Sequence, residues 1–203
     1  MTSPHVTVVV VTHEGPGGRI RRCVASVERA GGCDTVVVVD NSGGALAVGD
    51  PRPAYGTGVD GVVTMPNRGY GAAANAGFAW AREHAPQGLC SVVALLNDDV
   101  VVRPGWLNAL VDVLDGDDRF GAVQPKILFA QDGSLNSAGV VLDRYHAGSD
   151  VGFGAPDGPA WTGCAEIDAF SGGAVAFRAD FLEDTGGFDE RFFLYYEDVD
   201  LAL

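Results

Sequence analysis

Two adjacent acids, Asp98 and Asp99, follow Asn97 at the end of an apolar run, in the stretch LLNDDVV. Such residues either form a turn or hold a divalent cation, because Asp and Asn favour turns and carboxylate oxygens are the ligands that Mg²⁺ and Mn²⁺ prefer. For an isolated acidic pair after a strand, the turn is the more common role. Two other apolar runs also end in polar residues, so the choice depends on whether the three ends lie together.

The other two polar endings are THE at residues 12–14 and DNS at residues 40–42. The apolar runs 6–12, 35–40 and 91–96 are β-branched or aliphatic almost throughout, which is typical of strands buried on both faces of a parallel sheet. Ligands of open α/β sheets bind outside the carboxyl ends of the strands. If these strands are neighbours, their polar endings therefore converge on one cleft.

Helical patterns lie between the strands and must position them. They cover residues 17–31, 70–85 and 104–114, with Pro104 well placed at a helix start, and a further short strand is expected at 62–66. This order of elements predicts a parallel sheet with right-handed crossovers.

The second half of the chain has a different pattern. Short strand candidates at 121–129, 137–143 and 172–180 follow one another without long helices between them. We therefore expect α/β structure that becomes mixed α+β, in a single domain over residues 1–203 whose two halves share a sheet.

The composition excludes several classes of function. The 203 residues contain 13 Lys and Arg against 27 Asp and Glu, for a net charge of −14. This balance argues against non-specific binding of nucleic acid and against a broad basic surface for anionic lipid, although a local basic patch remains open. No stretch approaches the roughly 20 apolar residues of a membrane span, and the N-terminus lacks the basic start of a signal peptide.

The cysteines show neither CxxC spacing nor zinc-finger spacing to a histidine. We interpret them as buried thiols in a reducing compartment, which predicts a soluble, cytoplasmic protein. They are Cys23, Cys33, Cys90 and Cys164.

Two further motifs could carry chemistry. PNRGYGAAANAG, residues 66–77, begins a helix with small residues only, which lets an anion or a sugar approach, or else permits tight packing of the helix on the sheet. FLYYEDVDLAL brings Glu197, Asp198 and Asp200 after an aromatic run. These acids either favour a helix N-terminus or include a general base whose pKa is raised by partial desolvation.

Taken together and in this order, the motifs resemble the inverting GT-A glycosyltransferases of family 2, especially their bacterial rhamnosyltransferase-like branch. The resemblance covers nearly the whole chain and rests on VVVVTHEG, VVVVDNSGG, NRGYGAAANAG, LLNDDVVVRPGWL and FSGGAVAFRADFLEDTGGFDERFFLYYEDVDLAL. It implies a Rossmann-like, mostly parallel central sheet flanked by helices, with a nucleotide-binding half at 1–100 and an acceptor and catalytic half at 101–203.

The resemblance also implies roles for single residues. Asp198 would be the catalytic base with Glu197 beside it, and Asp99 would bind Mg²⁺ or Mn²⁺. NDD would be the DxD motif, with Asn97 in place of the first Asp. The remaining predicted contacts to the nucleotide sugar are Thr12, His13, Glu14, Asp40, Asn41, Arg68, Asn75, Asn97, Asp98, Gly172 and Gly173.

The implied reaction is metal-dependent transfer of a sugar from a nucleotide-sugar donor to a glycan or polyprenyl-linked acceptor in cell-envelope or polysaccharide synthesis. The branch favours dTDP-rhamnose, ahead of UDP-galactofuranose or UDP-GlcNAc. A nucleotidyltransferase remains a second hypothesis, although EDVD has no role in it. A non-catalytic module that only binds a nucleotide or a partner is the third.

The chain stops at Leu203, inside EDVDLAL. In the family an Arg usually follows and a metal-binding His often lies further on, so the resemblance predicts a C-terminally truncated chain. We expect nucleotide binding to survive and full activity to be lost. Missing segments would supply peripheral contact with the inner face of the membrane.

Overall fold

The central sheet has six strands, in the order β3-β2-β1-β4-β10-β5. The computed structural model describes residues 4–44, 49–86 and 90–203. Strands β1 to β4 are parallel to their neighbours, whereas β10 runs antiparallel to both β4 and β5. The strand bounds are β1 His5–Thr12, β2 Thr35–Asp40, β3 Gly61–Thr64, β4 Cys90–Asn97, β5 Ala122–Val123 and β10 Ala174–Arg178.

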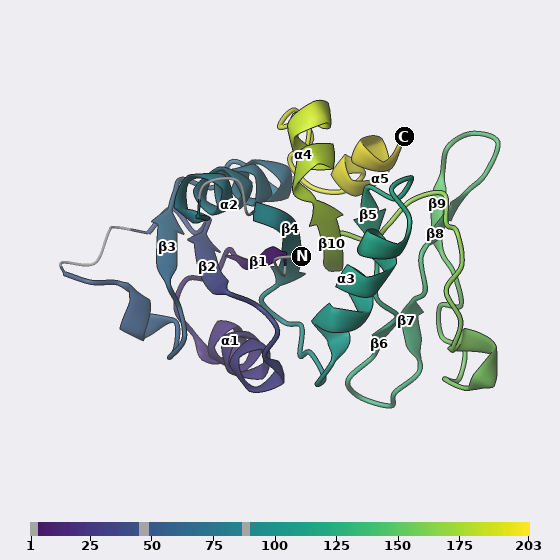
Figure 1. Ribbon diagram of the computed structural model, residues 1–203, viewed down its shortest axis with the longest axis horizontal. Helices are drawn as coiled ribbons and strands as arrows, with labels where there is room; N and C mark the ends of the chain where they lie inside the picture. The colour runs from purple at the N-terminus through teal and green to yellow at the C-terminus, as the bar shows by residue number, and fades with distance from the viewer. Residues whose placement is uncertain (1–3, 45–48, 87–89) are drawn as a thin grey trace.

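Helices cover both faces of this sheet. Buried residues of α1 and α3 belong to one apolar core, and those of α2, α4 and α5 belong to a second core on the opposite face, an arrangement that Figure 1 shows most clearly for α1 and α2. The α-helices are α1 Gly18–Ala30, α2 Tyr70–His84, α3 Trp106–Gly116, α4 Ala179–Thr185 and α5 Glu197–Ala202, with short 3-10 turns at Arg52–Ala54 and Pro159–Trp161.

The valine runs explain the three layers. In β1, Val8 and Val10 point into the core beneath α1, while Val9 and Val11 point into the core beneath α2. All four are buried, because a central strand alternates its side chains between two covered faces. The predicted doubly covered parallel sheet is confirmed.

The second half contributes two strands of the main sheet and two small hairpins. Strand β6 (Ile127–Leu128) pairs with β7 (Leu135–Ser137), and β8 (Val140–Leu142) pairs with β9 (Gly148–Asp150), at the right-hand end of Figure 1. The strand expected at 121–129 is thus split between two sheets.

Proline and glycine account for two shifted boundaries. Pro125 stands between β5 and β6 and has no backbone N–H for a ladder. Pro104 was expected at the start of a helix, but α3 begins at Trp106, after Gly105 in a left-handed conformation with φ 81°.

The cysteine prediction is wrong at one position. Cys23 is buried, which raises the pKa of its thiol to about 12, and Cys33 is partly buried. Cys164 is exposed, in the irregular segment before β10. The side chain of Cys90 lies outside the described residues, as do residues 45–48 of the predicted loop after β2.

Within the described ranges, no helix is both long enough and apolar enough to cross a membrane.

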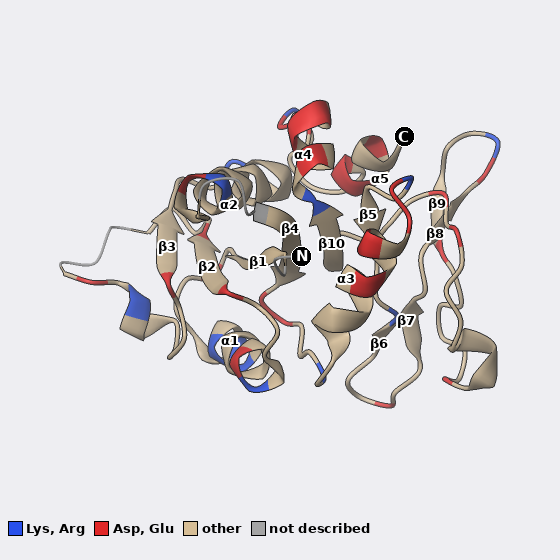
Figure 2. Cartoon of the chain, viewed as in Figure 1, with Lys and Arg blue, Asp and Glu red and all other residues tan. Residues whose placement is uncertain are grey.

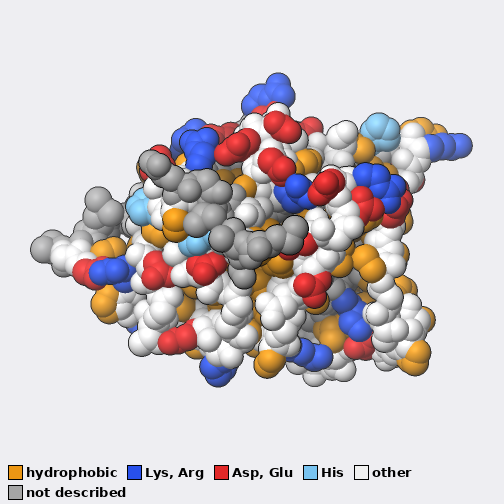
Figure 3. Space-filling model, in the orientation of Figure 1, with side chains coloured by type: hydrophobic (Ala, Val, Ile, Leu, Met, Phe, Trp, Pro, Cys, Tyr) orange, Lys and Arg blue, Asp and Glu red, His pale blue; other side chains and the backbone are white. Residues whose placement is uncertain are grey.

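Charge is distributed as many short-range pairs. Acidic residues mark α4 and α5 in Figure 2, and acidic and basic side chains are interspersed over the face that Figure 3 shows. Three arginines each fold back onto the Asp two residues earlier: Arg52 onto Asp50, Arg119 onto Asp117 and Arg191 onto Asp189. Exposed pairs of this kind contribute little stability, but they occupy the few cations that the chain has.

Close packing of α2 on the sheet depends on Gly77. A Cβ placed there would lie 2.2 Å from Val9 Cγ1 and 3.2 Å from Val39 Cγ2. Both valines are fully buried, so neither can move aside without a shift of the strand. This supports tight helix-on-sheet packing for the small residues of the NRGYGAAANAG motif near Gly77.

We therefore expect Gly77→Ala to destabilise the protein by about 1 to 3 kcal/mol through overpacking, outweighing the ~1 kcal/mol that alanine gains in a helix. Urea unfolding followed by circular dichroism measures this. Gly116→Ala, at an exposed end of α3 where a Cβ would meet nothing within 4 Å, is the matched control and should leave stability equal or slightly higher. Equal midpoints for Gly77→Ala and the parent would contradict the packing argument.

Candidate active site

The polar strand endings meet at the point where the order of strands reverses. From β1 the chain passes through α1 to β2 on one side, whereas α2 leads from β3 to β4 on the other side of β1. The carboxyl ends of β1 and β4 therefore flank a topological switch point, the usual ligand site of open α/β sheets. The expectation that β1, β2 and β4 are neighbours is confirmed.

Asp98 lies at the centre of a buried cluster at this point. Thr12 Oγ1 donates a hydrogen bond of 2.6 Å to Asp98 Oδ2, and Arg19 Nη2 donates one of 2.8 Å to Asp98 Oδ1. Asp98 is only 4% exposed, and its hydrogen bond raises the pKa of Arg19 above the ordinary value. Both carboxylate oxygens of Asp98 are thus committed to protein partners, because a buried charge must be paired.

Asp99 has the opposite environment. Its side chain is 61% exposed and lines a large cleft, and Arg19 Nη2 lies 3.9 Å from its Oδ2. The Val100 N–H bonds to the Asn97 carbonyl at 3.2 Å, which closes a turn around the two acids. One turn therefore sends Asp98 inward to the fold and Asp99 outward to the cleft.

The cleft has a volume of about 1040 Å³. Five segments line it: Tyr70 at the start of α2, the end of β4 with the loop to α3, the β6 hairpin, the turn at 171–173, and residues 194–198. It brings together six of the residues predicted from the sequence: Asn97, Asp99, Gly172, Gly173, Glu197 and Asp198.

Asp198 ties α5 to the turn at 171–173. Its Oδ2 accepts a 2.9 Å hydrogen bond from the Gly172 N–H, and its Oδ1 accepts one of 2.9 Å from the Val199 N–H. Tyr70 Oη donates a 2.5 Å hydrogen bond to the Gly172 carbonyl from the other side. These contacts hold the Asp198 carboxylate in one orientation at the cleft wall.

Glu197 is the desolvated carboxylate of the site. It is 5% exposed, and burial raises its pKa above the ordinary value of 4.5. Its Oε2 is buried and has no hydrogen-bond partner. An unsatisfied acceptor of this kind is costly, so it marks a position that a proton or a ligand donor would stabilise.

Tyr70 shows that the acids of the cleft converge. Burial raises the pKa of its hydroxyl well above the ordinary value, and the charges of Glu197, Asp198 and Asp99 raise it further. Asp99, the predicted metal ligand, is distant in sequence from Glu197 and Asp198, the predicted catalytic acids. The charges of all three act on the Tyr70 hydroxyl.

The end of β2 organises its own loops and does not line that cleft. Asp40 is buried and accepts hydrogen bonds from Tyr55 Oη at 2.5 Å and from the Ser42 N–H at 2.9 Å. Asn41 donates to the Gly69 carbonyl at 3.0 Å and accepts from the Arg68 N–H at 3.2 Å. This side of the switch point is a second group, apart from the cleft acids.

At the end of β1, His13 and Glu14 are exposed, and Glu14 accepts a 3.1 Å hydrogen bond from Arg19 Nη1. Gly15, with φ 70°, brings the next turn so close that a Cβ would lie 3.7 Å from Asp40 Oδ2. The ends of β1 and β2 are thus adjacent, as the predicted base and ribose pocket requires.

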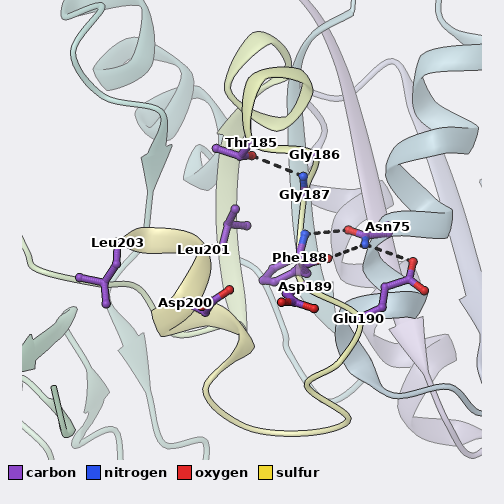
Figure 4. Close-up of a pocket in the computed structure, with 10 residues that line it drawn as sticks. All are labelled: Asn75, Thr185, Gly186, Gly187, Phe188, Asp189, Glu190, Asp200, Leu201 and Leu203. Carbon is purple, nitrogen blue, oxygen red and sulfur yellow. Dashed lines mark hydrogen bonds between the residues drawn. The ribbon is translucent and has the colours of Figure 1, made fainter.

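Arg68 and Asn75 do not line the cleft. Arg68 Nη2 pairs with Glu190 Oε2 at 2.6 Å, and Asn75 exchanges hydrogen bonds of 2.8 and 2.9 Å with the backbone of Phe188. Asn75 lines a separate pocket of about 670 Å³ with residues 185–190 and the end of α5 (Figure 4). Asn75 thereby fixes the segment after α4 to α2 through hydrogen bonds.

Sequence reasoning passed over three residues of the site: Arg19, Tyr55 and Tyr70. Arg19 had a signal, since it is the second residue of the helix that follows the first strand and so starts at the switch point. Tyr70 stands inside the NRGYG motif, where the glycines and Arg68 were considered but the tyrosine was not. Tyr55 comes from an irregular loop, and no pattern places such a residue beside Asp40.

An exposed aromatic loop borders the cleft. Phe193, Leu194, Tyr195 and Tyr196 are all exposed, and both tyrosines have left-handed backbones with φ 70° and 68°. The Phe193 carbonyl accepts a 3.0 Å hydrogen bond from the Tyr70 N–H. A Cβ at Gly69 would lie 2.3 Å from that carbonyl oxygen, so the start of α2 requires glycine there.

The cleft suits a divalent cation that takes most of its ligands from a substrate. The described residues contain no group of three or more His, Cys, Asp or Glu that could hold a metal ion by themselves. Mg²⁺ and similar ions in phosphate-transfer sites are held by one or two carboxylates together with substrate phosphates. Asp99 offers one such carboxylate, which is exposed to the cleft that Asn97 also lines.

A family model supplies the remaining observation. Residues 7–150 match the model described as Glycosyl transferase family 2. The chain belongs to glycosyl transferase family 2. This confirms the predicted family, and it favours a sugar transferase over the nucleotidyltransferase.

Relatives of this family 2 glycosyltransferase agree. The chain is 30% identical over 214 residues to an N-acetylglucosaminyl-diphospho-decaprenol L-rhamnosyltransferase from Mycobacterium tuberculosis, with 96% of this chain and 68% of the relative covered. It is 33% identical over 130 residues to the O-antigen biosynthesis protein RfbC of Myxococcus xanthus, covering 61% of this chain and 10% of that one. The predicted rhamnosyltransferase-like branch is confirmed.

Solved structures show the same fold. GalNAc-T7, in a crystal structure with UDP, GalNAc and Mn²⁺, superposes with a TM-score of 0.68 at 16% identity over 98% of this chain and 40% of that one. TarS from S. aureus superposes with a TM-score of 0.57 at 14% identity over 98% of this chain and 54% of that one. The chain thus spans 40% and 54% of these two solved chains, and the GT-A fold is confirmed.

The raised pKa of Glu197 predicts a stability effect with a definite sign. Because the folded pKa lies above the unfolded value, this carboxyl contributes its stability below pH 4.5, and the contribution is lost as pH rises through the folded pKa. We expect Glu197→Gln to be more stable than the parent at pH 8, with the difference vanishing towards pH 4. Urea unfolding across this pH range measures it.

Glu183→Gln, at an exposed position of α4, is the matched control and should follow the parent at every pH. A Glu197→Gln variant that loses stability at pH 8 would contradict the desolvation of this group.

Proposed function

We propose that this chain is the nucleotide-sugar-binding and catalytic part of an inverting, metal-dependent glycosyltransferase. It transfers a sugar, best matched by rhamnose from dTDP-rhamnose, to a lipid-linked glycan of the cell envelope. One observation carries the proposal: the open carboxylate of Asp99 and the acids Glu197 and Asp198 line one cleft beside the switch point of the sheet.

The donor diphosphate needs a counter-charge. The chain has 13 basic residues against 27 acidic ones, so protein cations are scarce. A divalent cation held by Asp99 and the donor phosphates would neutralise the charge that develops on the leaving diphosphate. The solved structure of GalNAc-T7 holds UDP with Mn²⁺, which supports Mn²⁺ or Mg²⁺ in this role.

Asp198 acts as the base in this proposal. Its two backbone hydrogen bonds fix the direction in which its carboxylate points, and a fixed carboxylate at a cleft wall can accept the proton of an acceptor hydroxyl. The hydroxyl then attacks the sugar from the face opposite the leaving group, which inverts the anomeric centre in one displacement. Glu197, desolvated and adjacent, supports that step.

The ends of β1 and β2 hold the nucleoside. Asp40 and Asn41 shape the pocket through buried hydrogen bonds, while Thr12, His13 and Glu14 border it from β1. Asp98 keeps Arg19 and Thr12 in place beneath the donor. Gly172 and Gly173 let the sugar approach the backbone of the turn, and Arg68 and Asn75 brace the loop on the donor side.

The nature of donor and acceptor rests on the relatives. The Mycobacterium tuberculosis relative is a rhamnosyltransferase whose name gives an N-acetylglucosaminyl-diphospho-decaprenol acceptor. We assign this chain a dTDP- or UDP-sugar donor. Its acceptor is then a glycan linked to a lipid diphosphate, like the acceptor in that relative's name. We propose that the reaction takes place at the cytoplasmic face of the membrane.

Isothermal titration calorimetry with dTDP and with UDP, each with and without Mn²⁺, tests the donor site. We expect Mn²⁺-dependent binding that weakens at least about a hundredfold in Asp99→Ala, because the phosphates lose their metal bridge. Asp112→Ala, an exposed acid on α3, is the matched control and should bind as the parent does. Nucleotide binding that depends on neither Mn²⁺ nor Asp99 would contradict the proposed metal site. A folded chain that binds neither dTDP nor UDP would favour the hypothesis of a non-catalytic module.

Asp198→Asn tests the base. We expect kcat to fall by about 10²- to 10⁴-fold with the nucleotide Kd unchanged, since the amide keeps the shape but accepts no proton. Transfer from dTDP-rhamnose to a prenyl-diphosphate-linked GlcNAc acceptor gives the rate. Asp200→Asn, two residues along the same helix, should retain the parent rate. A nearly active Asp198→Asn enzyme would move the role of base to Glu197.

A further inference from the structure

We propose that Arg103 and Lys126 form the site that binds the diphosphate of the lipid-linked acceptor. The inference rests on the proposed function and assigns residues to an acceptor contact. Both side chains line the cleft that contains Asp99 and Asp198: Arg103 comes from the same β4–α3 loop as Asp99, and Lys126 is the residue before β6. Figure 2 shows the start of α3 and β6 side by side.

These two are the basic side chains that line the cleft. Lys126 is the only lysine of the sequence. Arg103 is exposed, and among the described contacts its side chain makes no hydrogen bond and no ion pair, unlike the arginines that fold back onto neighbouring acids. A cationic group left open in a cleft is a ready partner for a phosphate.

Asp157 is the acid that pairs with Lys126 in this structure. Lys126 Nζ donates a 2.5 Å hydrogen bond to Asp157 Oδ1, and this contact lowers the pKa of Asp157. The charge of Arg103 lowers the same pKa further, so the guanidinium is close enough to act on that carboxylate. Asp157 thus pairs directly with Lys126, while Arg103 acts on it from beyond ion-pair distance, and a diphosphate in the cleft would compete with Asp157 for Lys126.

The surroundings of the pair are apolar. Ile127, Leu128 and Phe129 follow Lys126 along the cleft, and the exposed side chains of Val101, Leu194 and Tyr195 lie on its border. A free phosphate gains nothing from such neighbours, whereas a prenyl chain joined to a diphosphate gains both charge pairing and apolar burial. The site therefore has the two-part chemistry of an isoprenoid diphosphate.

The acceptor diphosphate is a better match for these cations than the donor diphosphate. The donor phosphates belong with the metal at Asp99, at the end of β4. Two diphosphates in one cleft repel each other, so the second needs its own counter-charge at a different position. Arg103 and Lys126 supply it without drawing on the metal.

Farnesyl diphosphate, kept below its critical micelle concentration and in EDTA, is the probe, because EDTA removes metal-mediated phosphate binding. Calorimetry with the chain should show saturable binding that weakens at least about tenfold in Arg103→Ala and in Lys126→Ala, and more in the double variant. Asp157→Asn should tighten binding by removing the competing carboxylate. Arg29→Ala, an exposed arginine on α1, is the matched control and should change nothing.

Three comparisons decide the source of the anion. Inorganic pyrophosphate should bind at least about tenfold more weakly than farnesyl diphosphate, because it lacks the apolar chain; equal affinity would overturn a lipid site. Farnesol should bind more weakly still. The dTDP affinity in Mn²⁺ should be unchanged in Arg103→Ala and Lys126→Ala; a loss of dTDP affinity with intact farnesyl diphosphate binding would give both cations to the donor and overturn the proposal.

The two proposals fail separately. Loss of Mn²⁺-dependent dTDP binding in the parent would remove the proposed donor site, while the farnesyl diphosphate pattern in EDTA would still support the cation pair. Equal farnesyl diphosphate affinity in the parent, the double variant and Asp157→Asn would reject the cation pair, whatever the nucleotide result.

Discussion

The buried carboxylate of Asp98 is the constraint on which the site depends. A charge removed from water must find partners, and Asp98 finds them in Thr12 from β1 and Arg19 from α1. These bonds link β1 and the turn after β4, which flank the switch point, to α1, the helix that leads from β1 to β2. They also determine where Asp99 points, because the turn that buries Asp98 directs the next side chain to the cleft.

A scarcity of positive charge shapes the rest of the molecule. With 27 acids and 13 bases, the protein pairs half of its arginines with carboxylates. Under our proposals, an anionic donor and an anionic acceptor would each need positive charge. A metal at Asp99 would serve the donor phosphates, and Arg103 together with Lys126, once released from Asp157, would serve the acceptor diphosphate.

Much of the fold could be predicted from the sequence, because the first half contains long, nearly continuous runs of valine. Runs such as VTVVVVT and TVVVVD have to be buried on both faces, so the parallel sheet and its switch point followed from them. The short strands of the second half could not be predicted in the same way, because two-residue strands such as β5 and β6 depend on tertiary contacts rather than on a sequence pattern. The cleft acids were found by type and order. Residues such as Tyr55 and Arg19 were missed, because their roles arise from three-dimensional neighbours.

Tyr70 joins three parts of the cleft, through its N–H to Phe193 and its hydroxyl to Gly172. The aromatic loop is anchored through the backbone of Phe193, and its exposed rings play no part in that anchorage. The left-handed positions of Tyr195 and Tyr196 also accept glycine or asparagine without strain. Substitution of the rings at 193, 195 and 196 would therefore change the border of the cleft while the carboxylates of Glu197 and Asp198 keep their positions.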